Sequence, residues 1–170
     1  MTDWIEYNRQ DSSSPITLEE ALAKHGRVIF PNVGTSMLPL LRQNRDLSVI
    51  ECRPADKDGK PLRCKKYDVV MYRRGNRYIL HRILKVLPDG YVICGDHNCY
   101  REYDIDDRHI IGIMTAFVRD GIETSVTDIK YRIYVHLWCD LYPIRVAILW
   151  LKSVLYRIKS AMKKNIKKNI

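Results

Sequence analysis

Short apolar runs alternate with turn-forming residues along the first two thirds of the chain. Each run is rich in Val, Ile, Leu or Tyr and is bounded by Gly, Pro, Asn or Asp, a pattern that predicts strands. The strands predicted in this way span residues 46–52, 66–73, 77–87, 91–94 and 110–118. Many short strands with frequent turns predict a mainly β fold, either a small barrel or a coiled sheet.

The segments between these strands are predicted to be turns and connectors. Gly75-Asn76 lies between two predicted strands and favours a hairpin. Residues 53–61 and 120–128 are polar and rich in turn-forming residues, and residues 104–108 are predicted to form an acidic turn.

A short helix is predicted at residues 16–25. Thr17 followed by Glu20 is a capping-box pattern, and Gly26 suits the C-terminal end of a helix. The apolar residues of this helix share one face, so we expect it to pack on the edge of the β domain. Residues 1–15 have neither the basic nor the apolar stretch of a signal peptide, so no leader or membrane anchor is expected before the helix.

The last third of the chain changes character. Residues 129–138 are apolar and aromatic, and they fit either a helix or a strand. Pro143 suits the first turn of a helix that extends to about residue 164. The apolar residues of this second segment recur at helical spacing and are Ile144, Ala147, Ile148, Leu151, Leu155, Ile158 and Met162.

Charge separates this C-terminal segment from the rest of the chain. The 170 residues carry 29 Lys and Arg against 20 Asp and Glu, a net charge of +9. Eight of the basic residues and none of the acidic ones lie in residues 143–170. Such a helix favours the surface of an anionic membrane, or else its apolar face docks on the β domain. Nucleic acid is the least favoured partner, because no helix-turn-helix pattern precedes the predicted strands.

A serine in the middle of a stiff turn is the first candidate for chemistry. It lies in the stretch Gly34-Thr35-Ser36-Met37-Leu38-Pro39, between two apolar runs. Gly34 permits unusual backbone dihedrals and Pro39 fixes one, so the turn has few conformations. A hydroxyl held on such a turn suits a nucleophile, because its position is fixed during folding rather than during the reaction. Taken alone, a serine of this kind more often hydrogen-bonds its own backbone.

Further motifs follow the serine turn in order. They are Tyr67-Asp68-Val69-Val70, Leu80-His81-Arg82-Ile83, Gly95-Asp96 with His97-Asn98 behind it, and Ile110-Ile111-Gly112-Ile113-Met114. Together with the serine turn they resemble the S24/S26 serine peptidase superfamily, which contains the signal peptidases and the LexA-like repressors. The resemblance covers residues 27–118 and is greatest to the Ser-His branch of the signal peptidases. It departs from the family pattern at Tyr67, where the family has glycine.

The resemblance implies a serine endopeptidase that cleaves an extended segment of a peptide or protein substrate through an acyl-enzyme. In it Ser36 is expected to be the nucleophile and His81 the general base. Asp96 is the residue that the family pattern assigns to orienting His81, and Glu102 lies where the histidine branch has a second acid. The expected substrate and oxyanion region consists of the turn residues Gly34, Thr35, Met37 and Pro39. No cofactor is implied.

Elementary chemistry supports a histidine base, and it also leaves an alternative. A histidine with a pKa of about 6.5 is mostly neutral at pH 7, so it can take a proton from serine and return it to the leaving amine. His81 also fits a half-buried structural residue, because it alternates with apolar neighbours on a predicted strand. Asp96, directly after a glycine, also fits a turn residue. The alternative is therefore a catalytically inactive module of the same fold that binds peptides or regulates.

Cysteine usage and composition complete the expectations. A chain that is 46% apolar and 29% charged is expected to be globular. Its five cysteines, an odd number, predict reduced thiols in a cytoplasmic protein. The protein is expected to be peripheral on a membrane surface if its basic helix binds there. Cys94, His97 and Cys99 lack the paired spacing of a structural zinc site, so no metal is expected. The expected organisation is an N-terminal segment (1–26), a peptidase-like β domain (27–118) and a basic helical region (119–170).

Overall fold

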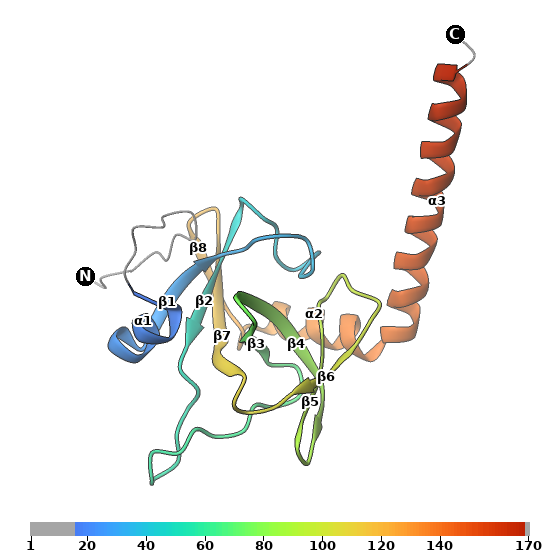
Figure 1. The fold of residues 1–170 in the computed structure, drawn as a ribbon. Coiled ribbons are helices and arrows are strands. Elements are labelled where there is room, and N and C mark those ends of the chain that lie inside the picture. Colours follow the sequence, from blue (N-terminus) through green and yellow to red (C-terminus); the bar gives the residue numbers. More distant parts are fainter. Residues whose placement is uncertain (1–15, 169–170) are drawn as a thin grey trace.

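The computed structural model describes residues 16–168, and the expectations for residues 1–15 lie outside this range. An antiparallel sheet forms the body of the domain, with a short helix beside its first strand and two consecutive helices at the C-terminal end of the chain (Figure 1). The mainly β class expected from the sequence is therefore confirmed.

In the described part of the chain, eight strands form the sheet. They are β1 (Arg27–Pro31), β2 (Asp46–Glu51), β3 (Val69–Arg74), β4 (Arg77–Leu87), β5 (Gly90–Cys94), β6 (Glu102–Ile105), β7 (Ile110–Arg119) and β8 (Ile122–Ser125). Their order in the sheet is β1-β2-β7-β3-β4-β5-β6, and β8 pairs with β7. Within the described residues the end strands β1 and β6 do not pair with each other, so the sheet is open and the barrel alternative is wrong.

Most strands lie where the apolar runs predict them. The five predicted strands correspond to β2, β3, β4, β5 and β7, within a few residues of the expected bounds. The Gly75-Asn76 hairpin is confirmed, because β3 and β4 pair with each other up to Arg74 and Arg77. Two polar strands, β6 and β8, lie where the sequence predicts a turn and a connector. They form because their backbones pair with a neighbouring strand. This pairing cannot be predicted from the pattern of their own side chains.

The first helix follows its sequence signals closely. α1 spans Leu18–His25, and its capping box is complete: the Thr17 hydroxyl accepts the Glu20 N–H at 3.2 Å, and the Glu20 carboxylate accepts the Thr17 N–H at 2.8 Å. Gly26 ends the helix with a φ of 71°, a left-handed conformation that suits glycine. The helix packs against β1 and contributes to the main core the buried side chains of Leu18, Ala21 and Leu22.

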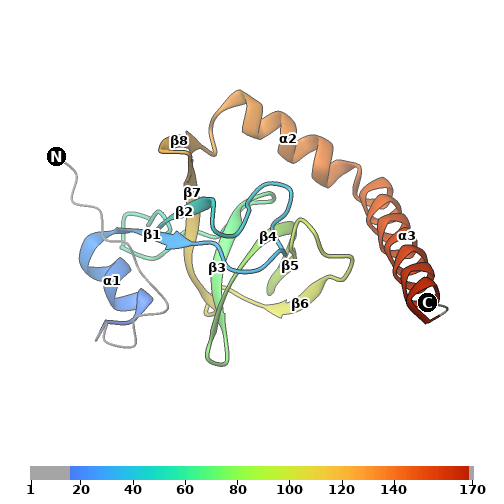
Figure 2. The ribbon, with the colours of Figure 1, turned by 90° about the horizontal axis from the view of Figure 1, so that it is seen from above.

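The C-terminal third forms two helices. α2 spans Ile129–Asp140, so the segment left open between helix and strand is a helix, and α3 spans Tyr142–Lys168. α3 runs away from the sheet along most of its length (Figures 1 and 2). In contrast, α2 packs on the sheet and adds to the main core Tyr131, Val135 and Cys139. None of the helices in the described range combines the length and the apolar character needed to cross a membrane.

A buried ion pair connects the sheet to α2. Arg82 on β4 and Asp96 in the loop after β5 have fully buried side chains and share two hydrogen bonds, at 2.9 and 2.7 Å. The Tyr134 hydroxyl donates to the Asp96 carboxylate at 3.0 Å, and the Trp138 indole donates to the Asp96 carbonyl at 2.8 Å. Arg82 also donates to the Tyr131 hydroxyl at 3.0 Å. The pair therefore fixes the point at which β4, this loop and α2 meet.

Replacing Asp96 with alanine is expected to lower the free energy of unfolding by about 3–5 kcal/mol, because it leaves the Arg82 guanidinium buried without a counter-charge. Urea unfolding followed by circular dichroism measures the change. The control is Asp106→Ala, which removes a partly exposed carboxylate that pairs with the exposed side chain of Arg108 and with His109. The control is expected to lose much less stability, and equal losses in the two variants would contradict the role given to the buried pair.

Candidate active site

Ser36 lies in the loop between β1 and β2, and it is half-buried. Two backbone hydrogen bonds close the turn that carries it: the Leu38 N–H donates to the Thr35 carbonyl at 3.1 Å, and the Leu41 N–H donates to the Met37 carbonyl at 2.9 Å. The tight turn that the sequence predicts around the serine is therefore present.

A buried carboxylate holds the far end of this loop. Asp46, the first residue of β2, accepts the Arg42 N–H at 2.8 Å and pairs with Arg119 on β7 at 2.9 Å. Arg119 also donates to the Leu40 carbonyl at 2.5 Å. Burial alone would raise the pKa of the Asp46 carboxyl, but hydrogen bonds from Arg45 and Arg119 outweigh it and hold this pKa well below its usual range. Asp46 therefore stays charged at neutral pH and keeps the loop attached to the sheet.

His81 lies in the middle of β4 and is only 4% exposed. Its Nδ1 is 2.7 Å from Oε1 of Glu102 on β6. The Tyr72 hydroxyl on β3 donates to the other Glu102 oxygen at 2.8 Å and lies 3.1 Å from His81 Nδ1. Arg74 pairs with the same carboxylate at 3.1 Å. When Nδ1 donates its proton to Glu102, Nε2 carries the lone pair and can accept a proton.

Ser36 and His81 approach each other around Gly95, which follows β5. A Cβ atom on Gly95 would lie 2.6 Å from the Ser36 carbonyl oxygen and 2.9 Å from His81 Nε2, so these two atoms are no farther apart than the sum of the two distances. The His97 N–H donates to the Ser36 carbonyl at 2.7 Å and ties the serine turn to the same loop. Glycine is required at position 95 because any side chain would occupy the space between the serine turn and the imidazole.

Glu102, rather than Asp96, contacts the imidazole. The Asp96 carboxylate instead binds Arg82 and Tyr134, which corrects the expectation that Asp96 orients His81. The reason is the pleat of β4. His81 and Arg82 are consecutive residues of one strand, so their side chains point to opposite faces of the sheet, and Asp96 lies on the Arg82 side. The second acid carried over from the family pattern is the one in contact.

Burial sets the acid–base properties of this cluster. Burial lowers the pKa of His81 from its usual value of about 6.5, and the Glu102 carboxylate partly opposes that shift. Burial and the same carboxylate raise the pKa of the Tyr72 hydroxyl, which therefore stays protonated and acts as a donor. The imidazole is neutral at pH 7, the form that a general base requires.

A small, mostly apolar cavity lies beside Ser36. Its volume is 170 Å³, below the range of about 300–1,000 Å³ that small-molecule sites occupy, so it suits a single side chain rather than a cofactor. Of the expected substrate region, Gly34 and Met37 line this cavity. Thr35 is exposed at the tip of the turn, and Pro39 borders a different hollow next to α2.

Two residues of the cluster, Tyr72 and Arg74, have no counterpart in the sequence-based site. The predicted hairpin could have indicated that they lie near His81, because it pairs their strand with the strand of His81. Because side chains alternate along a strand, the residues at positions 70, 72 and 74 share a face, and position 70 is the partner of His81. The pairing places them near the imidazole, but it does not indicate that they bind a glutamate from β6.

Tyr67 stands where the S24/S26 pattern has glycine, and its surroundings account for this difference. It has a φ of 79°, in the left-handed region where a non-glycine residue costs about 1–2 kcal/mol. Its carbonyl accepts a hydrogen bond from Arg82 at 3.0 Å, and its hydroxyl donates to Asp140 on α2. The ring also meets His136 of α2 edge-on, with the ring centroids 5.1 Å apart. These contacts with α2, which glycine would lack, offset the backbone strain.

Metal ligands do not gather in the part of the chain that the structure describes. No three His, Cys, Asp or Glu side chains there are close enough to hold a metal ion. The buried Cys94 Sγ instead lies within hydrogen-bond distance of the carbonyl oxygens of Gly95 and Tyr100, at 3.3 and 3.0 Å. No disulfide joins the five cysteines, all of which lie in the described residues.

Comparisons with known proteins found no relative of this chain. No family model, no curated protein and no solved structure matches this chain. The resemblance to the S24/S26 superfamily therefore rests on the motifs and their order, and function has to be argued from the site itself.

Replacing Gly95 with alanine is expected to force the serine turn and His81 apart, because the new methyl group would lie within 3 Å of both. The expected results are a loss of about 1–3 kcal/mol in the free energy of unfolding and a loss of Ser36 labelling by a fluorophosphonate probe. Urea unfolding and labelling of the folded protein measure the two effects.

The control for this prediction is Gly112→Ala. Its methyl group would lie 2.7 Å from the Glu51 carbonyl, so a comparable loss of stability is expected away from Ser36. Labelling of the folded control should persist. If both variants kept full labelling, Gly95 would have no role in bringing the serine and the histidine together.

Proposed function

We propose that this protein is a serine endopeptidase with Ser36 as nucleophile and His81 as general base. The observation that carries the proposal is the approach of the serine turn to His81 Nε2 around Gly95, with the Glu102 carboxylate on Nδ1 of the same ring. A hydroxyl, an imidazole and a carboxylate in series are what nucleophilic catalysis at neutral pH requires. A module that only binds peptides has no need for all three.

The proposed reaction passes through an acyl-enzyme. Ser36 Oγ attacks the carbonyl carbon of the scissile peptide bond while His81 Nε2 takes the hydroxyl proton. The Ser36 backbone N–H donates to the oxyanion, and Glu102 stabilises the imidazolium through Nδ1. His81 then gives the proton to the leaving amine. Water, deprotonated by His81, attacks the ester and releases the new carboxyl terminus together with Ser36 in its original form.

The remaining members of the cluster act on Glu102 rather than on the substrate. Tyr72 donates to one oxygen of Glu102, and Arg74 pairs with the same oxygen, while the other oxygen binds His81. Tyr72 and Arg74 are therefore positioning residues. They hold the carboxylate at the angle that keeps the Nδ1 proton in place and leaves Nε2 directed at the serine turn.

The cavity beside Ser36 indicates the substrate class. It is lined largely by apolar residues of β1, the serine turn and β4, including Phe30, Met37 and Leu80. A small apolar side chain of an extended peptide fits a cavity of this size and lining. In the proposed complex the peptide lies along the serine turn, with its backbone held by hydrogen bonds and one side chain in the cavity.

Fluorophosphonate labelling tests the proposal. The wild-type protein is expected to react once, at Ser36, and Ser36→Ala is expected to abolish labelling. The rate at which the protein cleaves a library of unstructured peptides should fall by roughly 10⁴-fold or more in Ser36→Ala and in His81→Ala, because the two residues act as a unit. Ser153→Ala, which removes an exposed hydroxyl on α3, is the control and should label normally. Absence of labelling and cleavage in the wild type would favour the inactive peptide-binding module.

The pH profile tests the role of Glu102. Because burial lowers the pKa of His81, kcat/KM of the wild type is expected to hold as pH falls to 6.5 and to decline only below it. Glu102→Gln removes the charge that opposes this shift, so the acid limb should move to still lower pH. The maximum should fall by roughly 10²–10⁴-fold, because the imidazolium loses its counter-charge.

The control for the pH profile is Asp104→Asn, which removes an exposed carboxylate two residues along β6. It pairs with Arg74 but does not touch His81, so the acid limb should stay in place. An unshifted or upward-shifted limb in Glu102→Gln would contradict the assignment of Glu102.

A further inference from the structure

The outward face of α2 carries a row of apolar side chains, bordered by the exposed charged residues Lys130 and Asp140. Its inward side chains pack on the sheet, but every fourth residue on the opposite side is exposed to solvent. These residues, the α2 stripe, are between 46% and 67% exposed and comprise Ile129, Ile133 and Leu137 on the helix and Leu141 directly after it. Residues four apart lie on one face of a helix, so they form a row rather than scattered exposed positions.

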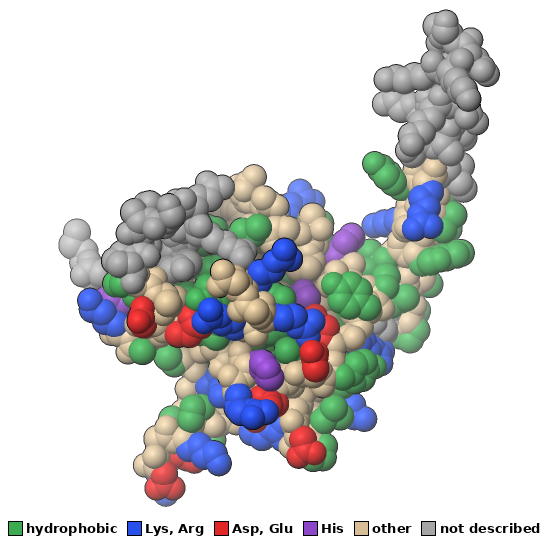
Figure 3. All heavy atoms as spheres, in the orientation of Figure 1, with side chains coloured by type: hydrophobic (Ala, Val, Ile, Leu, Met, Phe, Trp, Pro, Cys, Tyr) green, Lys and Arg blue, Asp and Glu red, His purple; other side chains and the backbone are tan. Residues whose placement is uncertain are grey.

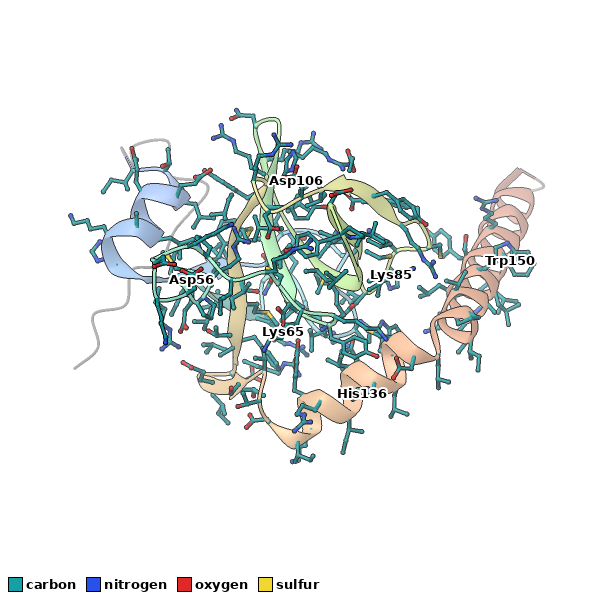
Figure 4. All side chains as sticks on the ribbon, turned by 90° about the horizontal axis from the view of Figure 1, so that it is seen from below. Asp56, Lys65, Lys85, Asp106, His136 and Trp150 are labelled. Carbon is teal, nitrogen blue, oxygen red and sulfur yellow. The ribbon has the colours of Figure 1, made fainter. Side chains whose placement is uncertain are left out.

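A second apolar row continues along α3. The α3 stripe comprises Ile144, Ile148, Leu151 and Leu155, all about half-exposed. Its spacing of three and four residues continues that of the α2 stripe across the junction of the two helices. Figure 3 shows hydrophobic side chains gathered along this part of α3, and Figure 4 shows Trp150 on the section that stands clear of the sheet. The sheet therefore does not cover the α3 stripe, and the alternative of docking on the β domain is wrong for this part of the helix.

Basic residues border the α3 stripe. Lys152 and Lys159 are exposed, and each follows a member of the stripe by four residues. From residue 143 to the end of the chain there are eight Lys and Arg and no Asp or Glu. Ile158 and Met162 are also expected on the apolar face, but their side chains are not among those that the structure describes. An exposed apolar row with cations beside it matches an interface between water and anionic lipid headgroups.

We propose that the α2 and α3 stripes bind the surface of an anionic membrane, with the helices lying in the headgroup region. Charge decides between this occupant and a second copy of the chain. Pairing two copies through these stripes would bring two sets of uncompensated cations together, whereas an anionic bilayer neutralises them. Each lysine or arginine near such a surface and each buried apolar side chain adds to the binding.

This surface lies close to the candidate active site. The inward side of α2 binds the Asp96 carboxylate and carbonyl through Tyr134 and Trp138, and Asp96 follows Gly95 in the chain. One helix diameter, about 10 Å, therefore separates the lipid-facing row from the loop beside Ser36. The loop beside Ser36 would then lie within a short peptide's reach of the bilayer surface.

Co-sedimentation of the full chain with vesicles tests the proposal. Vesicles of phosphatidylcholine with phosphatidylglycerol should bind more tightly than phosphatidylcholine alone, and added salt should weaken the binding. Lys152→Gln combined with Lys159→Gln should weaken it by roughly 30-fold at low salt. Leu151→Asp and Ile133→Asp, one in each stripe, should each weaken it by about tenfold or more. All these positions are exposed, and circular dichroism verifies that the variants fold.

Ser153→Asp is the matched control, because it adds the same charge to an exposed position of α3 on the side opposite Leu151. It should bind nearly as the wild type does, and so should Ser36→Ala, which makes the result independent of peptidase activity. Equal binding to both vesicle types, or equal loss in Ser153→Asp and Leu151→Asp, would overturn the proposal. A dimer in analytical ultracentrifugation that Leu151→Asp dissociates would assign the stripe to a second copy instead.

Discussion

The ion pair between Arg82 and Asp96 determines where the parts of this protein meet. Both charges are buried, and removing a charge from water costs several kcal/mol unless a partner and further hydrogen bonds compensate. Any arrangement that separates β4 from the loop after β5 leaves two such charges unpaired and is strongly disfavoured. The chain neighbours of the pair are His81 and Gly95, so the same interaction brings the imidazole to the edge of the serine turn.

Local signals in the sequence were enough to predict much of the fold. The capping box of α1 and the Gly75-Asn76 hairpin involve residues a few positions apart, so their physics is contained in a short stretch of chain. β6 and β8 could not be found in this way, because polar strands are specified by the backbone of a distant neighbour. Whether the sheet closes into a barrel also depends on how its two end strands lie, which no single segment encodes.

In the candidate site, too, local features could be predicted from the sequence, whereas contacts between distant segments could not. The turn around Ser36 and the position of His81 on a strand follow from motifs, but the partner of the imidazole depends on which face of β4 each acid reaches. Alternation along the strand assigns Asp96 to Arg82 and leaves His81 to Glu102, a result that requires the path of the chain between β5 and β6. Tyr67 is a related case. Its strained backbone is understandable only with α2 in place, because α2 supplies the contacts that compensate it.

α2 is in contact with the protein on one side and with solvent on the other, and this has a thermodynamic consequence. Its inner side is part of the wall around Asp96, while its outer side presents Ile133 and its neighbours. A ligand that binds the outer side only when the helix is seated also favours the seated state. By reciprocity, an event that seats the helix by ordering the inner loop would increase the affinity of that ligand for the outer side. For such a ligand the two sides of this one helix would be energetically coupled.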